Sequence, residues 1–70
     1  MQRTTVKSSN LASVGYDAAE HILEVEFISG VVYQYDDVPS DVHTALMAAA
    51  SHGSYFMGEI WGVFPTRRMN

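Results

Sequence analysis

Hydrophobic and polar residues alternate with a period of two across the middle of the chain. Residues 23–27 read Leu-Glu-Val-Glu-Phe, and residues 31–36 read Val-Val-Tyr-Gln-Tyr-Asp. This period is typical of strands that bury one face. β-Branched and aromatic residues, which strands favour, fill both segments. The pattern predicts two neighbouring strands of an antiparallel hairpin.

The length of the loop between these strands decides which residues share a face. A two-residue loop at Ser29 and Gly30 would align the apolar positions of one strand with the polar positions of the next. A three-residue loop needs a residue with positive φ at its third position, which Gly30 supplies. This loop places all six apolar residues on one face. The predicted pairs are Phe27 with Val31, Val25 with Tyr33, and Leu23 with Tyr35.

A further strand is predicted before residue 17, because Val14 and Tyr16 share a parity. A four-residue loop over 17–20 would pair Tyr16 with His21 and Val14 with Leu23. Leu11 is out of phase with Val14, which predicts a bulge or a strand start near residues 12–13.

After Asp36 the period changes to 3.6, which is typical of helices. Pro39 ends the sheet because it cannot donate to a strand ladder. Ser40 is the expected N-cap of a first helix, and Gly53 is the expected residue beyond its end. The predicted buried stripe is Val42, Ala45, Leu46 and Ala49.

A second, shorter helix is predicted from Tyr55 to about Val63, capped by Ser54 and ended by Pro65. Its predicted buried stripe is Phe56, Ile60 and Val63. The fold class is therefore α+β: a three-stranded antiparallel β-meander followed by two helices packed on one sheet face. We expect residues 1–8 to be a flexible N-terminal tail, 9–65 a single domain, and 66–70 a C-terminal tail.

Composition limits the functions open to the chain. Its 70 residues make one domain at most, and its net charge of −4 disfavours a wide footprint on nucleic acid. It has no cysteine, so neither a disulfide nor a thiolate metal site can form. No apolar run reaches ~20 residues and no signal-peptide pattern is present. No membrane partner is expected, and a cytoplasmic location is the default expectation.

Catalytic and metal-binding patterns are weak. The three histidines, His21, His43 and His52, do not have the i, i+3 or i, i+4 spacing of a ligand pair. Glu24 and Glu26 share a sheet face and are best interpreted as its solvated side. A domain of this size leaves little room for a pocket of ~300 Å³ or more. We therefore expect no enzyme activity, no metal, no cofactor and no small-molecule substrate.

Two residue sets remain as candidate binding sites. Tyr33 and Tyr35 share a face and are interpreted first as core residues, although two exposed tyrosines would make a platform for stacking bases. The only basic patch would form if the two tails met. Its residues would be Lys7, Arg67 and Arg68. The second set, Met57, Trp61 and Phe64, would form an apolar patch of the kind that marks partner surfaces.

The order of several short motifs resembles the KTSC domain family. They are Ser9-x-Leu11, Val14-Gly15-Tyr16-Asp17, Leu23 to Phe27, Gly30 to Tyr35, Val38-Pro39, and Ala50-Ser51-x-Gly53-Ser54-Tyr55-Phe56. The family takes its name from a segment at the C-terminus of some lysyl-tRNA synthetases and also includes small stand-alone bacterial proteins. The resemblance implies a non-catalytic accessory module, and RNA binding is suggested from the synthetase attachment. Gln34 stands here where relatives often carry a basic residue.

Two hypotheses follow. The first is a module that binds RNA, such as a tRNA-like ligand, through Tyr33, Tyr35, Lys7, Arg67 and Arg68. The alternative is a protein-interaction or self-association module that uses Met57, Trp61, Phe64 and an open sheet edge.

Overall fold

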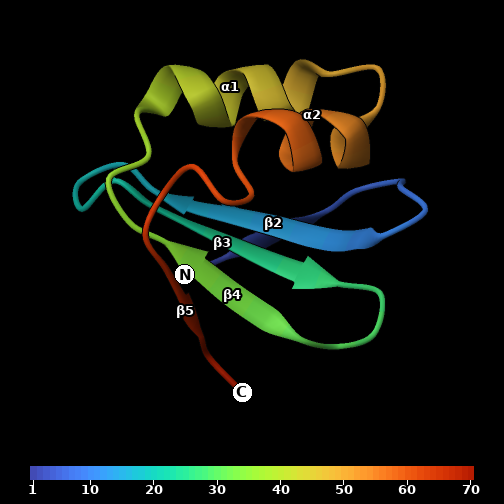
Figure 1. The fold of residues 1–70 in the computed structure, drawn as a ribbon, viewed down its shortest axis with the longest axis horizontal. Coiled ribbons are helices and arrows are strands. Elements are labelled where there is room, and N and C mark those ends of the chain that lie inside the picture. The colour runs from blue at the N-terminus through green and yellow to red at the C-terminus, as the bar shows by residue number, and fades with distance from the viewer.

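The computed structural model describes all 70 residues as a five-stranded antiparallel sheet with two helices over one face (Figure 1). The strands follow the chain order β1-β2-β3-β4-β5. Neither helix is long and apolar enough to cross a membrane. The strands are β1 (Arg3–Thr5), β2 (Leu11–Asp17), β3 (Ile22–Phe27), β4 (Val32–Tyr35) and β5 (Thr66–Arg68), and the helices are α1 (Ser40–Ala48) and α2 (His52–Glu59).

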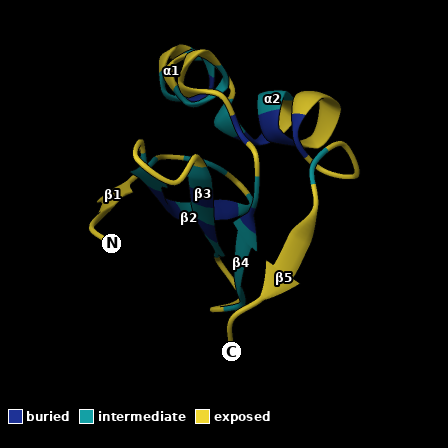
Figure 2. Cartoon of the chain, turned by 90° about the vertical axis from the view of Figure 1, so that its left-hand side faces the viewer, coloured by how far each residue is buried: buried dark blue, intermediate teal, exposed yellow.

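The α+β class and the two covering helices agree with the sequence, but the prediction of three strands was wrong. Both segments expected to be loose tails contain edge strands. β1 pairs with β2, and β5 pairs with β4. These edge strands are three residues long and exposed on both faces, so they carry no alternation that a sequence pattern can reveal (Figure 2).

The β3–β4 hairpin has the predicted register. Val25 pairs with Tyr33 and Leu23 pairs with Tyr35. The amide of Phe27 donates to the carbonyl of Val31 at 2.9 Å, which closes the three-residue loop. Gly30 has a φ of 93°, a conformation that strains any residue with a Cβ. The apolar residues of both strands therefore face the helices, as expected.

The first hairpin keeps the predicted parity but not the predicted register. Tyr16 pairs with Leu23 and Val14 with Val25, because the loop covers residues 18–21 instead of 17–20. The carboxylate of Asp17 accepts from the amides of the two residues that follow Ala18, which fixes the start of this turn. The predicted bulge is confirmed by a register shift between Leu11 and Ser13.

Both helices begin and end earlier than predicted. Ser40 is the first residue of α1 and not its N-cap, and α1 ends at Ala48. Gly53 lies inside α2, whose N-cap is Ser51. The Ser51 hydroxyl accepts from the amide of Ser54 at 3.2 Å. Because α2 ends at Glu59, the predicted third member of its buried stripe, Val63, is 61% exposed.

The core lies between the helices and the sheet. Nine apolar residues form one buried cluster: Leu11, Val14, Leu23, Val25, Tyr35, Val38, Leu46, Phe56 and Ile60. Gly53 permits α2 to pack directly on the loop before β2, since a Cβ there would collide with the Asn10 amide oxygen. The side chain of Ser8 holds this loop by accepting from the amides of Asn10 and Leu11.

The sheet face away from the helices carries a polar row that links the two edge strands. Arg3 pairs with Glu24 at 3.2 Å, and Gln34 donates to the same carboxylate at 2.8 Å. Arg67 donates to Gln34 at 3.2 Å and to Asp36 at 2.7 Å. These five side chains therefore connect β1 to β5 on the face away from the helices. Glu24 lies on the face that its parity predicts, but its side chain is only 14% exposed because Arg3 and Gln34 cover it.

Candidate aromatic groove between the second helix and the sheet edge

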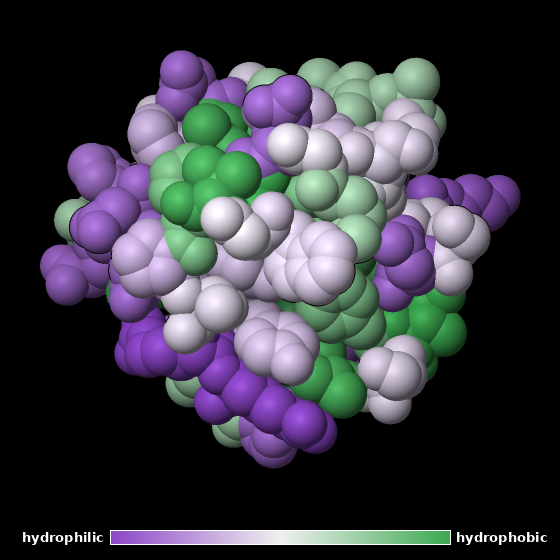
Figure 3. Space-filling view, in the orientation of Figure 1, coloured by the Kyte–Doolittle hydropathy of each residue, from purple (hydrophilic) through white to green (hydrophobic).

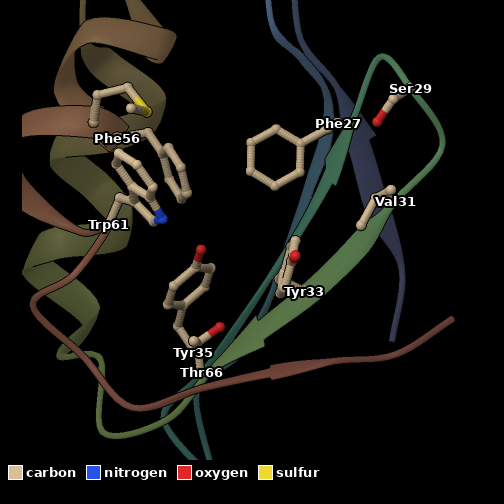
Figure 4. A pocket seen from close by; sticks show the side chains of 9 residues that line it. Phe27, Ser29, Val31, Tyr33, Tyr35, Phe56, Trp61 and Thr66 are labelled. Carbon is tan, nitrogen blue, oxygen red and sulfur yellow. The ribbon is translucent and has the colours of Figure 1, made fainter.

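A groove of about 580 Å³ opens between α2 and the β4–β5 edge of the sheet. We call it the aromatic groove. Side chains from the sheet and from the α2 region point toward one another across it (Figure 4). It is lined by Phe27, Ser29, Val31, Tyr33, Tyr35, Phe56, Met57, Trp61 and Thr66.

Edge-to-face contacts fix the inner wall of the groove. The ring centroids of Phe27 and Tyr33 are 5.8 Å apart, and those of Phe27 and Phe56 are 5.5 Å apart. Tyr35 continues the series with a centroid 5.6 Å from that of Phe56. Each pair lies within the range that aromatic quadrupoles favour. Phe56 and Tyr35 are also fully buried, so this wall is formed before any ligand arrives.

The outer wall of the groove consists of side chains that the fold leaves in water. Met57 on α2 is 43% exposed, and Trp61 in the turn after α2 is 59% exposed. Figure 3 shows pale and green surface between the helical layer and the sheet, bordered by strongly hydrophilic surface over β5. Trp61 thus presents a large aromatic surface that the core does not use.

No charged side chain lines the groove. The polar groups on its surface are the hydroxyls of tyrosine, serine and threonine and the indole N–H of Trp61. Burial raises the pKa of the Tyr35 phenol; the Thr66 side chain lowers it in part, and the neighbouring Tyr33 raises it. The Tyr35 phenol is therefore neutral near pH 7, and the groove suits an uncharged, largely apolar group.

The five residues of the nucleic-acid hypothesis do not gather at one place. Tyr35 is only 1% exposed, so it cannot stack with a base. Lys7 lies in the loop between β1 and β2, at the opposite end of the strand order from β5. Arg67 lies on the solvent-facing side of the sheet and pairs with Asp36. Only Tyr33 and Arg68, which are register partners, stand together on the groove face.

Two of the three residues of the protein-interaction hypothesis do meet. Met57 and Trp61 both line the groove, whereas Phe64 is partly buried against the core. The expectation that so small a domain has little room for a pocket was wrong. The groove exists because α2 ends early. Gly62 has a φ of 78°, and the chain turns away there and leaves the β4–β5 edge uncovered. Gly62 is the residue in the sequence that could have indicated this turn.

A second, polar hollow lies at the other end of the molecule, beside the β2–β3 turn. The rings of Tyr16 and His43 stack there with centroids 4.6 Å apart, and the Tyr16 hydroxyl donates to the Val38 carbonyl at 2.6 Å. Burial lowers the pKa of His43, and burial together with Asp41 and Asp17 raises the pKa of Tyr16. These contacts fix the start of α1 to the sheet. No group of three side chains in the structure is placed to hold a metal ion.

Known proteins give the family of the chain. A solved KTSC domain protein from Yersinia pestis has a TM-score of 0.94 and 41% identity, covering 99% of this chain and 97% of its own. An uncharacterized protein of Stutzerimonas stutzeri is 50% identical over 80% of this chain and 79% of its own length. A protein of Tsukamurella paurometabola is 43% identical over 76% of this chain and 79% of its own. The family model described as the KTSC domain matches residues 7–64. The chain belongs to the KTSC domain family.

Proposed function

We propose that this protein is a protein-interaction module whose aromatic groove receives an apolar side chain from a partner. The observation that carries the proposal is the exposure of Met57 and Trp61 over a preformed, uncharged groove. Tryptophan is the residue most enriched among those that dominate binding energy at protein interfaces. A groove of this volume and apolar character is also typical of ligand sites.

Charge favours a protein partner over RNA. The chain carries eight acidic and four basic residues. Arg3 and Arg67 are paired with Glu24 and Asp36, which leaves Lys7 and Arg68 at opposite ends of the strand order. Affinity for nucleic acid depends on how many phosphates are neutralised together. Arg68, which stands alone beside Tyr33, could neutralise very few phosphates.

Selection of peptides from a random display library on the immobilised protein tests this function. We expect peptides with large apolar residues to be enriched, and their binding to shift the emission of Trp61, the sole tryptophan. Trp61→Ala should weaken the selected peptides by about 30-fold, as an interface residue worth about 2 kcal/mol would. The matched control is Val63→Ala, because Val63 is equally exposed and lies outside the groove.

Two outcomes would contradict the proposal. One is a selection in which no peptide is enriched on the wild-type protein relative to the Trp61→Ala protein. The other is salt-sensitive binding of single-stranded RNA that competes with the selected peptides, which would restore the nucleic-acid hypothesis.

A further inference from the structure

The strand next to the groove has an unpaired edge. On either side of β5, the Pro65 carbonyl accepts from the Asp36 amide at 2.8 Å, and the Met69 amide donates to the Val32 carbonyl at 2.8 Å. Inward-bonding residues alternate in an antiparallel ladder, so Arg67 also faces β4. The backbone amides and carbonyls of Thr66 and Arg68 therefore point away from the sheet. They are available to a further strand.

Side-chain parity connects this edge to the groove. Thr66 is the register partner of Tyr35, and Arg68 is the register partner of Tyr33. Partners across a ladder place their side chains on the same face. The residues of an added strand that hydrogen-bond to Thr66 and Arg68 would therefore also project onto the groove face. One would stand beside Thr66, which lines the groove, and the other beside Arg68.

The charge at this edge differs between the two faces of the sheet. On the solvent-facing side, Arg67 is neutralised by Asp36. On the groove side, Arg68 has no Asp or Glu side chain within ion-pair distance, and its Nε donates to the main-chain oxygen of Asn70 at 2.7 Å. An acidic side chain on an added strand would complement this cation, whereas a second cation would be repelled.

We propose that the partner is an extended peptide segment that adds to β5 as an antiparallel strand. It carries an acidic residue opposite Arg68 and, two residues later, a large apolar residue opposite Thr66 that enters the aromatic groove. The acidic residue comes first because the two strands are antiparallel: moving toward the C-terminus of the peptide corresponds to moving from Arg68 to Thr66 on β5. This inference rests on the proposed function and specifies its binding mode: backbone bonds give affinity and alternate side chains give specificity.

The peptides selected from the display library test the motif. We expect them to share an Asp or Glu followed, after one residue, by Phe, Trp, Tyr or Leu. A synthetic fluorescein-labelled heptapeptide of the consensus should bind more weakly when its acidic residue is replaced by lysine. Enriched peptides without this spacing would overturn strand addition. If those peptides still lost binding to Trp61→Ala, the proposed function of the aromatic groove would stand.

Two variants of one residue separate the backbone from the charge. Arg68→Ala removes the cation but keeps the outward amide, whereas Arg68→Pro removes both. Proline is compatible with an edge strand when the missing amide faces outward. We expect Arg68→Pro to bind the consensus heptapeptide about two- to tenfold more weakly than Arg68→Ala, as loss of one hydrogen bond implies. Equal affinities of the two variants would overturn the proposal.

Folding of the variants is checked by circular dichroism. If Arg68→Pro does not fold, Thr66→Pro against Thr66→Ala repeats the comparison at the other outward amide, with the same expected and contradicting results.

Discussion

The two ends of the helix-facing sheet surface have the same sequence pattern but different structures. In one region, which we call the filled region, Leu23, Val25 and Leu46 have no exposed surface. Under α2, the same alternation leads to an open groove in which Phe27 and Tyr33 are only half-buried. The alternation indicates which face a side chain occupies. It does not indicate whether a helix extends far enough to cover it.

This difference explains what the sequence could predict. Gly30 and the parity of residues 23–35 determined the β3–β4 register, because only one loop length puts the apolar residues on one face. β5 could not be predicted, since its polar, three-residue segment follows a proline and is held mainly by its partner strand. The N-cap of α2 was misplaced by three residues, because Ser51 and Ser54 are both good capping residues.

The candidate site was predicted only in fragments. Met57 and Trp61 were singled out as an apolar patch, and Tyr33 and Tyr35 were placed on the helix-facing side. Nothing in the spacing showed that these residues line one groove, because they meet through tertiary packing of α2 against β3 and β4. The basic patch was predicted on the condition that the two ends of the chain meet. The strand order instead places β1 and β5 at opposite edges of the sheet.

The largest contrast between the two regions should come from truncating one side chain in each. Leu23→Ala leaves a cavity in the filled region and should lower the free energy of unfolding by about 2–5 kcal/mol. Trp61→Ala removes a larger but exposed side chain and should change it by no more than about 0.5 kcal/mol. Urea unfolding followed by circular dichroism measures both. A similar loss of stability in the two variants would mean that Trp61 packs against the core and is not available to a partner.

A smaller loss should follow when a methyl group is added where α2 meets the loop before β2. Gly53→Ala places a Cβ against the Asn10 amide and should cost about 1–3 kcal/mol in overpacking. Gly58→Ala is the control, since nothing lies within 4 Å of a Cβ there. It should be neutral or slightly stabilising because alanine favours helices. Equal unfolding midpoints for the two variants would show that this contact is loose.

The polar row should contribute less than either packing contact. Arg67→Ala breaks the exposed pair with Asp36 and should lower the free energy of unfolding by at most about 1 kcal/mol, with a smaller effect at high salt. Lys7→Ala, which breaks no ion pair, is the control. Unfolding in low and high salt measures the difference, and a loss that does not change with salt would assign the effect to packing of the Arg67 stem.

The smallest effect concerns His43, which stacks on Tyr16 at the start of α1. Burial lowers its pKa below the ordinary value of 6.5, so the unfolded chain takes up a proton at a higher pH than the folded protein does. His43 therefore adds a loss of stability as the pH falls through 6.5 toward the folded-state pKa. His43→Gln should lose less stability than the wild type between pH 7.5 and 5. Parallel pH dependences in urea unfolding would contradict this.

Chemical-shift mapping of the labelled protein with the consensus heptapeptide shows which surface the peptide binds. We expect the largest changes on the Trp61 indole and on the backbone amides of Thr66 and Arg68, with the amides of Arg3 and Glu24 unaffected. Changes concentrated on the polar row, or at the hollow beside His43, would contradict the assignment of the aromatic groove as the binding surface.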